Sequence, residues 1–287
     1  MKGKVEVAGL AAGTMLPEYR VRARNTSVHS ENKIHDDTVA RQFGFGGGLV
    51  PGTTVYAYMT HPVVRALGPA WLAGGRMVVR FAKPAYEGEE LTIGVVVTAS
   101  EGDAAAGALG IEVTVLNPAG DSIAVGTAGL AWGAPSEPPD PSAYPAAPLP
   151  AERPPATREV LASLSALVSR ELRGDADSVS QYLHDVAETL DLYEGPSGFL
   201  HPGLLLQQAN QALSRNVRLG PWIHAASEVR YFSAARRPDT VSTRGRVASL
   251  FERRGHAFVE LDLLMVANGD RPAAHVRHTA IYKPRQV

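Results

Sequence analysis

The segment VPGTTVYAYM, residues 50–59, returns in altered form as HPGLLLQQAN at residues 201–210. In both segments a Pro-Gly pair precedes an apolar run with helical spacing. In the first copy Val55, Met59 and Val63 recur at four-residue steps. The run from residue 52 to residue 67 is apolar on most sides, so we expect a buried helix that begins at Gly52, and a second that begins at Gly203.

The segments that follow these two helices also match, in the same order and at an offset of about 150 residues. A Gly-Pro turn comes first, then two strands joined by a charged turn, then two strands joined by NPAGD or ANGD, which favour a hairpin. The matched ranges are 68–69 with 220–221, 77–97 with 228–247 and 111–132 with 259–282. Side chains alternate along the strands, with Met77, Val79 and Phe81 on one face. The fold class is therefore α+β, with two copies of a central helix wrapped by an antiparallel sheet.

A proline-rich stretch separates the two copies. PSEPPDPSAYPAAPLPAERPP, residues 135–155, holds nine of the 21 prolines. Proline has no amide donor and a fixed φ, so this stretch predicts an extended, semi-rigid linker. We expect an N-terminal domain at 1–134, a linker at 135–156 and a C-terminal domain at 157–287.

The composition excludes several classes of function. The chain has 287 residues, a formal net charge of -1, 45% hydrophobic residues and no cysteine. It therefore offers no field that would attract nucleic acid or an anionic membrane, no disulfide and no cysteine metal site. Neither a signal peptide nor a membrane span is predicted, and we expect a cytoplasmic protein.

Most candidate site residues lie in the segment SENKIHDDTVARQFGFGGGLVPG, residues 30–52. Its Asn32, Ile34, His35 and Asp37, followed by Ala40, Gly44–Phe45 and Gly52, resemble the motif of the MaoC-like (R)-specific enoyl-CoA hydratases and dehydratases. These are hotdog-fold proteins whose motif reads roughly G-D-x-N-P-I-H-x-D. The resemblance extends over about residues 15–130 and implies two fused hotdog domains, which form either a monomeric pseudo-dimer or part of a homo-oligomer.

The resemblance also implies a substrate and a set of site residues. The substrate would be an acyl thioester of CoA or of an acyl carrier, the reaction that of a lyase, and no cofactor would be needed. His35 would carry out proton transfer, with Asn32 as its neighbour in the motif. The helix start at Pro51, Gly52 and Thr53, together with Asp37, would bind the substrate. Backbone amides at a helix start are unpaired and favour a developing oxyanion.

The chain departs from the motif where the aspartate of the catalytic pair should stand. That position is Ser30, preceded by His29, and the motif proline is Lys33. A serine hydroxyl does not titrate in the range that acid–base catalysis needs, and the loss of one such group costs about 10²–10⁴-fold in rate. Glu31 is the alternative carboxylate. His35 has a structural alternative, in which it caps the helix that follows it.

The second half carries a weaker version of this pattern. His184–Asp185 precedes FLHPG, but Val179 stands where the motif has its aspartate, and His201 directly precedes the second helix. Three functions stay open: a hydratase that uses His35, an acyl-thioester-binding protein without turnover, and a thioesterase. The residues considered for a thioesterase are Gln207, Gln208 and Asp177.

Overall fold

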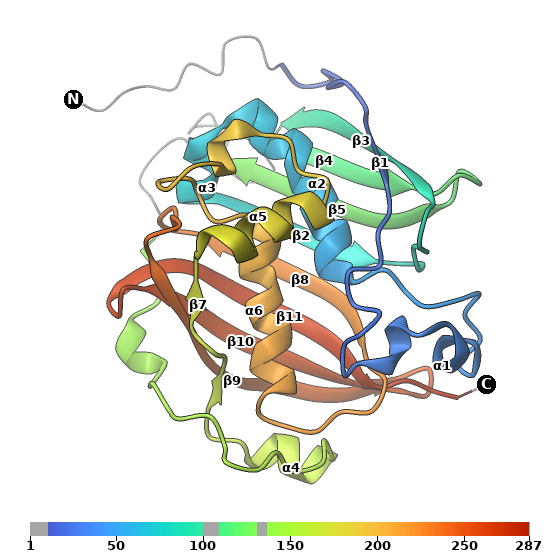
Figure 1. The fold of residues 1–287 in the computed structure, drawn as a ribbon, viewed down its shortest axis with the longest axis vertical. Helices are drawn as coiled ribbons and strands as arrows, with labels where there is room; N and C mark the ends of the chain where they lie inside the picture. The colour runs from blue at the N-terminus through green and yellow to red at the C-terminus, as the bar shows by residue number, and fades with distance from the viewer. Residues whose placement is uncertain (1–10, 100–108, 131–136, 287) are drawn as a thin grey trace.

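The computed structural model describes residues 11–99, 109–130 and 137–286. They form an 11-stranded antiparallel sheet, and two long helices pack against one of its faces (Figure 1). The strand order is β1-β3-β4-β5-β2-β8-β11-β10-β9-β6, and β7 pairs with β9. The first half of the chain supplies the first five strands of that order, and the second half supplies the rest.

The elements of the first half are β1 (Tyr19–Arg22), η1 (Lys33–His35), α1 (Asp37–Arg41), α2 (Gly52–Leu67), α3 (Pro69–Gly74), β2 (Gly75–Phe81), β3 (Glu90–Ala99), β4 (Leu109–Leu116) and β5 (Ser122–Leu130). Those of the second half are η2 (Pro141–Ala143), α4 (Arg158–Ser163), β6 (Leu167–Val168), β7 (Leu172–Arg173), α5 (Ala176–Asp185), η3 (Asp191–Tyr193), α6 (Pro202–Ser214), β8 (Ile223–Tyr231), β9 (Thr240–Arg253), β10 (His256–Ala267) and β11 (Arg271–Lys283).

Strands β2 and β8 join the two halves into one sheet. Their register pairs Val78 with Glu228, which stands 150 residues further along the chain. A local two-fold axis therefore passes between these two residues. The same operation relates β3, β4 and β5 to β9, β10 and β11, as the strand order shows. The predicted α+β fold with two hotdog units is confirmed.

Helix α2 is buried over most of its surface, as its sequence predicts. Tyr56, Met59 and Val63 are fully buried, and the helix ends before Gly68, whose φ is +62°. This left-handed conformation is one that glycine adopts without strain. The alternation predicted for β2 is also confirmed, since Met77 and Val79 are buried while Val78 between them is exposed.

The two copies differ in detail at two places. Helix α6 begins at Pro202, 150 residues after Gly52, where α2 begins, and its N-cap is His201. The Pro-Gly pair therefore lies one residue later relative to the helix start in the second copy than in the first. The prediction that the second helix begins at Gly203 is wrong by that residue. After the first Gly-Pro turn the chain forms the short helix α3, whereas after the second it is extended and β8 begins at Ile223.

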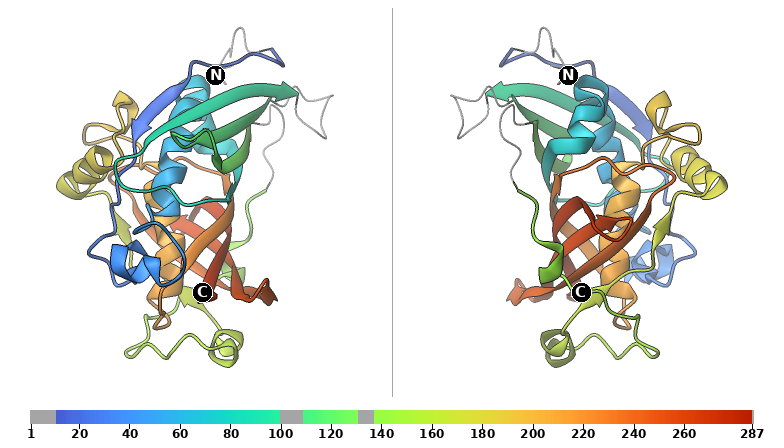
Figure 2. Two further views of the ribbon diagram at one scale, coloured as in Figure 1. Left: turned by 90° about the vertical axis from the view of Figure 1, so that its right-hand side faces the viewer. Right: turned by 90° about the vertical axis from the view of Figure 1, so that its left-hand side faces the viewer.

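The described part of the linker, from residue 137, lies on the outer face of the second half of the sheet; residues 135 and 136 lie outside the described ranges. Tyr144 is buried there, and its hydroxyl donates to Asp262 Oδ1 at 3.0 Å. Further along, Arg153 reaches back to the first half, where it pairs with Glu31 at 2.8 Å. The linker therefore contacts both halves, and in Figure 2 its course from residue 137 can be followed at the edge of the molecule.

Candidate active site

His35 lies at the end of the short helix η1, in a conformation set by hydrogen bonds. Its Nδ1 lies 2.7 Å from the carbonyl oxygen of Leu49. A carbonyl can only accept, so Nδ1 carries the proton and Nε2 is left as the basic nitrogen. Burial lowers the pKa of His35 below its ordinary value, although the bond to Leu49 opposes this shift. The neutral, proton-accepting form is therefore favoured at neutral pH.

A cavity of about 220 Å³ lies beside His35, where the two halves meet. Its walls come from both halves: His35, Gly52 and Phe81 from the first, and Trp222, His224 and Ile281 from the second. Most of the lining is apolar, with few polar groups, which is typical of a small-molecule site. The cavity therefore brings the predicted proton-transfer residue and the predicted helix start together.

The start of α2 faces this cavity without a side-chain cap, because its N-cap is Pro51. The amides of Thr54 and Val55 donate to the carbonyl oxygen of Pro51, whereas those of Gly52 and Thr53 have no acceptor among the described residues. Unpaired amides at the positive end of a helix dipole attract an oxygen that carries negative charge. This helix start can therefore hold a carbonyl oxygen.

Asn32 ties the motif loop to the second half of the chain. Its Nδ2 donates to the carbonyl oxygen of Trp222 at 2.9 Å, and its Oδ1 accepts from Trp222 N at 3.1 Å. The same Nδ2 lies 3.3 Å from His35 Nε2. Asn32 thus links the two halves at the rim of the cavity and supports the orientation of His35.

Ser30 and Glu31 border a second, more open cavity of about 510 Å³, which shares Asn32, His35 and Trp222 with the first. The hydroxyl of Ser30 donates to the carbonyl oxygen of Asn32 at 3.3 Å. The Glu31 side chain is exposed and paired with Arg153, which lowers the pKa of its carboxyl group. In the described part of the chain no carboxylate hydrogen-bonds to His35.

Asp37 takes a different place from the one predicted for it. Its Oδ1 accepts from Gly48 N at 2.8 Å, at the end of the glycine-rich loop, and it lines neither of the two cavities described above. A side chain at position 48 would collide with the carbonyl oxygen of His35. The loop is therefore packed closely against the motif, and Asp37 holds it there. Thr53 lines the second cavity.

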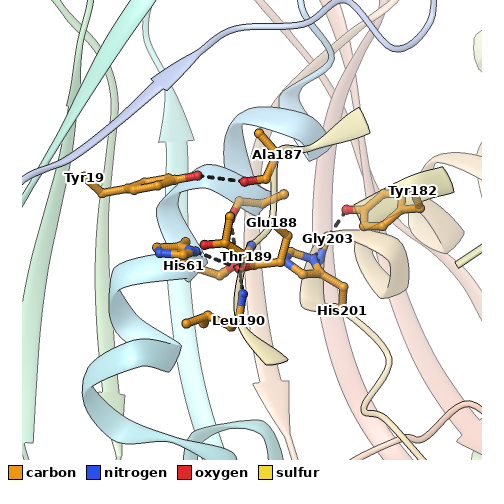
Figure 3. Close-up of polar contacts among 11 residues, drawn as sticks. Tyr19, His61, Tyr182, Ala187, Glu188, Thr189, Leu190, His201 and Gly203 are labelled. Atoms are coloured by element: carbon orange, nitrogen blue, oxygen red, sulfur yellow. Dashed lines mark hydrogen bonds and ion pairs between the residues drawn. The ribbon is translucent and has the colours of Figure 1, made fainter. Parts of the chain in front are cut away.

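The start of α6 is arranged in another way, which the sequence analysis missed (Figure 3). His201 Nδ1 accepts from Gly203 N at 3.0 Å and so caps the helix. Its Nε2 bonds to Glu188 Oε2 at 3.1 Å, and His61 Nδ1 from α2 lies 2.8 Å from Glu188 Oε1. The amides of Thr189 and Leu190 also donate to Oε1.

Glu188 is therefore a buried carboxylate with four donors. These hydrogen bonds hold its pKa well below the ordinary value, against the effect of burial. His184, the predicted counterpart of His35, is instead 70% exposed and lies beside Asp185 and Arg24. The one available sequence signal was His61, a titratable side chain in the middle of an apolar helix.

No family model matches the chain, and no curated protein matches its sequence. Several solved structures have the same fold. One, described as a MaoC domain protein dehydratase from Chloroflexus aurantiacus, has 11% identity, covers 96% of each chain and gives a TM-score of 0.69. Rv0216 from Mycobacterium tuberculosis, described as a double hotdog fold, has 17% identity, covers 95% of this chain and 96% of its own, and gives 0.63.

A third structure, an oleoyl thioesterase from Lactobacillus plantarum, has 12% identity, covers 96% of this chain and 99% of its own, and gives a TM-score of 0.55. The chain thus has the double hotdog fold, and its structural neighbours include MaoC-like dehydratases. The resemblance read from the motif is confirmed at the level of the fold. Among the described residues no helix combines the length and apolarity that a membrane crossing requires.

Proposed function

We propose that this protein hydrates 2-enoyl thioesters, or dehydrates the corresponding 3-hydroxyacyl thioesters, at the cavity beside His35. One observation carries the proposal: His35, whose Nε2 is the basic nitrogen, and the uncapped start of α2 both line the same cavity. Hydration needs a base for water and a positive site for the thioester oxygen, and these are the two groups present.

The steps follow from these positions. His35 Nε2 takes a proton from water as the water oxygen attacks C3 of the enoyl group. The electrons of the C2–C3 double bond move onto the thioester oxygen, which the Gly52 and Thr53 amides stabilise. The imidazolium then returns its proton to C2 as the enolate collapses. Gly52 lets the oxygen approach the helix start closely because it has no side chain.

The acyl chain would lie along the apolar walls of the cavity, next to Phe81 and Ile281. The thioester would be carried by CoA or by an acyl carrier protein. Neighbours described as dehydratases and as thioesterases share the fold, so the proposal rests on the site and not on the fold.

A second candidate is an acyl-thioester-binding protein without turnover. It is favoured by the environment of His35, because Ser30 stands in place of the motif aspartate and Glu31 is paired with Arg153. An imidazolium formed here would have no carboxylate beside it, which raises the barrier. The helix start would still bind the thioester oxygen.

Incubation with crotonyl-CoA tests these alternatives. Loss of enoyl absorbance without release of free thiol is the result we expect of a hydratase. Release of thiol would identify a thioesterase instead. Thermal stabilisation by crotonyl-CoA with neither product would identify the binding protein, and the absence of both stabilisation and product with shorter and longer enoyl-CoAs would contradict the site itself.

A further inference from the structure

Three polar side chains form a buried chain that leads from β11 to the start of α2. His278 Nδ1 lies 2.9 Å from Ser227 Oγ, and Ser227 Oγ lies 2.8 Å from His224 Nε2. All three residues are at least nine-tenths buried, and His224 lines the cavity. No part of the chemistry described above uses them.

The far nitrogen of His224 is directed at the helix start. A Cβ atom built on Gly52 would lie 2.8 Å from His224 Nδ1, so only glycine fits beneath this ring. Among the described residues Nδ1 has no hydrogen-bond partner, although it is buried. An unsatisfied buried polar atom is costly and rare, so a ligand that supplies the missing partner would be stabilised there.

The chain is compatible with a neutral donor form of His224. Burial lowers the pKa of His224 and lowers that of His278 to about 3, so both rings are neutral. The Ser227 hydroxyl donates to one ring and accepts from the other. When it donates to His224 Nε2, the proton of that ring is on Nδ1, and His224 becomes a donor toward the cavity without carrying charge.

We propose that His224 is a third donor to the thioester oxygen bound at the start of α2, held in its donor tautomer by Ser227 and His278. This inference rests on the thioester site proposed above. His224 would contact the substrate and is thus a catalytic residue, whereas Ser227 and His278 are positioning residues. The two halves of the chain then each contribute to one oxyanion site, with the amides from α2 and the imidazole from β8.

A chromophoric thioester, cinnamoyl-CoA, reports this contact through its absorbance, and in His35→Gln it does so without hydration. Donors to its carbonyl oxygen shift its absorbance to longer wavelength. We expect a clear shift on binding to the wild type and to His35→Gln, since proton transfer is not involved. His224→Phe keeps an aromatic ring and removes the donor, so it should lose most of the shift and lower the kcat of hydration by about 10²–10³-fold.

The positioning role has its own readout. Ser227→Ala breaks the chain but leaves the His224 ring in place, so it should reduce the shift only in part. A full shift and full activity in His224→Phe would overturn the proposal. If the wild type shows the shift but no hydration, the hydratase proposal fails and this one stands. If cinnamoyl-CoA binds without a shift, this one fails whatever the hydration assay gives.

A measurement on the wild type covers the case in which His224→Phe does not fold. The ¹⁵N chemical shifts of histidine ring nitrogens distinguish protonated from bare nitrogen. With saturating butyryl-CoA, which cannot be hydrated, we expect His224 Nδ1 to be protonated and Nε2 bare. A bare Nδ1 in the complex would contradict the assignment.

Discussion

The starts of α2 and α6 are related by the local two-fold axis, yet their surroundings differ. The start of α2 has a proline as N-cap, no side-chain cap and a cavity in front of it. The start of α6 is capped by His201, which in turn bonds to the buried Glu188. The duplicated fold therefore offers two possible oxyanion sites and keeps one of them open.

The start of α6, which we call the closed start, adds a link between the two halves. Glu188 accepts from His201 at the start of α6 and from His61 in the middle of α2. Tyr19 stacks on the His61 ring with a centroid separation of 4.0 Å. In our proposal the start of α2 binds the thioester, whereas the start of α6 is part of the interface between the central helices.

Breaking the closed start should have the largest effect. Glu188→Gln places an amide among four donors and leaves at least one buried hydrogen bond unmade. We expect the free energy of unfolding to fall by about 3–5 kcal/mol, as for other buried pairs that lose one partner. Urea denaturation measures this. Glu194→Gln, on an exposed position nearby, is the matched control and should change stability by less than about 0.5 kcal/mol.

A Glu188→Gln protein with wild-type stability would mean that the cluster contributes nothing to the interface. The closed start would then be an unused copy of the open one.

Restoring the carboxylate that the motif lacks tests the site at the start of α2, which we call the open start. Ser30→Asp places it in the loop beside His35, and we expect the rate of enoyl-CoA hydration to rise about 10²-fold, or about 2.7 kcal/mol of barrier. Glu31→Gln is the control. If Glu31 already served as the partner, Glu31→Gln would abolish activity and Ser30→Asp would gain little.

The open start should also be sensitive to a single methyl group. Gly52→Ala puts a Cβ atom against His224 Nδ1, so the ring or the helix start must move. We expect the affinity for butyryl-CoA to fall about tenfold or more, about 1.4 kcal/mol, as measured by titration calorimetry. Gly94→Ala, which has no atom near its added Cβ, should bind normally. Unchanged affinity in Gly52→Ala would place the thioester elsewhere.

The buried histidine His278 and the buried carboxylate Glu188 should make the free energy of unfolding depend on pH in different pH ranges. His278 has a folded-state pKa of about 3 and an unfolded value of about 6.5. Below pH 6.5 the unfolded chain binds a proton that the folded chain does not, so stability falls as pH decreases. The slope is up to about 1.4 kcal/mol per pH unit for each such histidine. Glu188, with a lowered pKa, contributes only below about pH 4.5, where its unfolded form begins to protonate.

Between pH 7 and pH 5 the pH dependence of stability, measured by denaturation at pH 7, 6 and 5, therefore comes mainly from the histidines. His278→Asn removes the titrating ring and keeps an amide near Ser227, so it should flatten the slope by up to one proton. An unchanged slope in this variant would mean that His278 is already protonated in the folded protein.

The sequence predicted the architecture well, because the information is local and repeated. Apolar spacing defined α2, alternation defined β2, and the constant offset predicted the two-fold relation. The position of His35 beside the helix start also followed from the motif. The one-residue offset between the Pro-Gly pairs was missed, because the strand register of the sheet, and not the Pro-Gly motif, determines which residues of the two halves are equivalent.

Contacts between distant residues could not be predicted in the same way. His61 and Glu188 are 127 residues apart, and Ser227 and His278 are 51 apart on different strands. Glu31 was considered as a partner of His35, but its position is set by Arg153 in the linker, 122 residues away. The sequence around each of these residues does not indicate which residue is its partner.

The most direct test of a single active site at the start of α2 is the rate of crotonyl-CoA hydration in His35→Gln beside His184→Gln. His184 is the exposed counterpart in the second half and serves as the matched control. We predict that His35→Gln lowers kcat/KM by about 10²–10⁴-fold while its stability changes by about 1 kcal/mol, and that His184→Gln retains wild-type activity. Hydration that survives in His35→Gln and is lost in His184→Gln would contradict the assignment of the site.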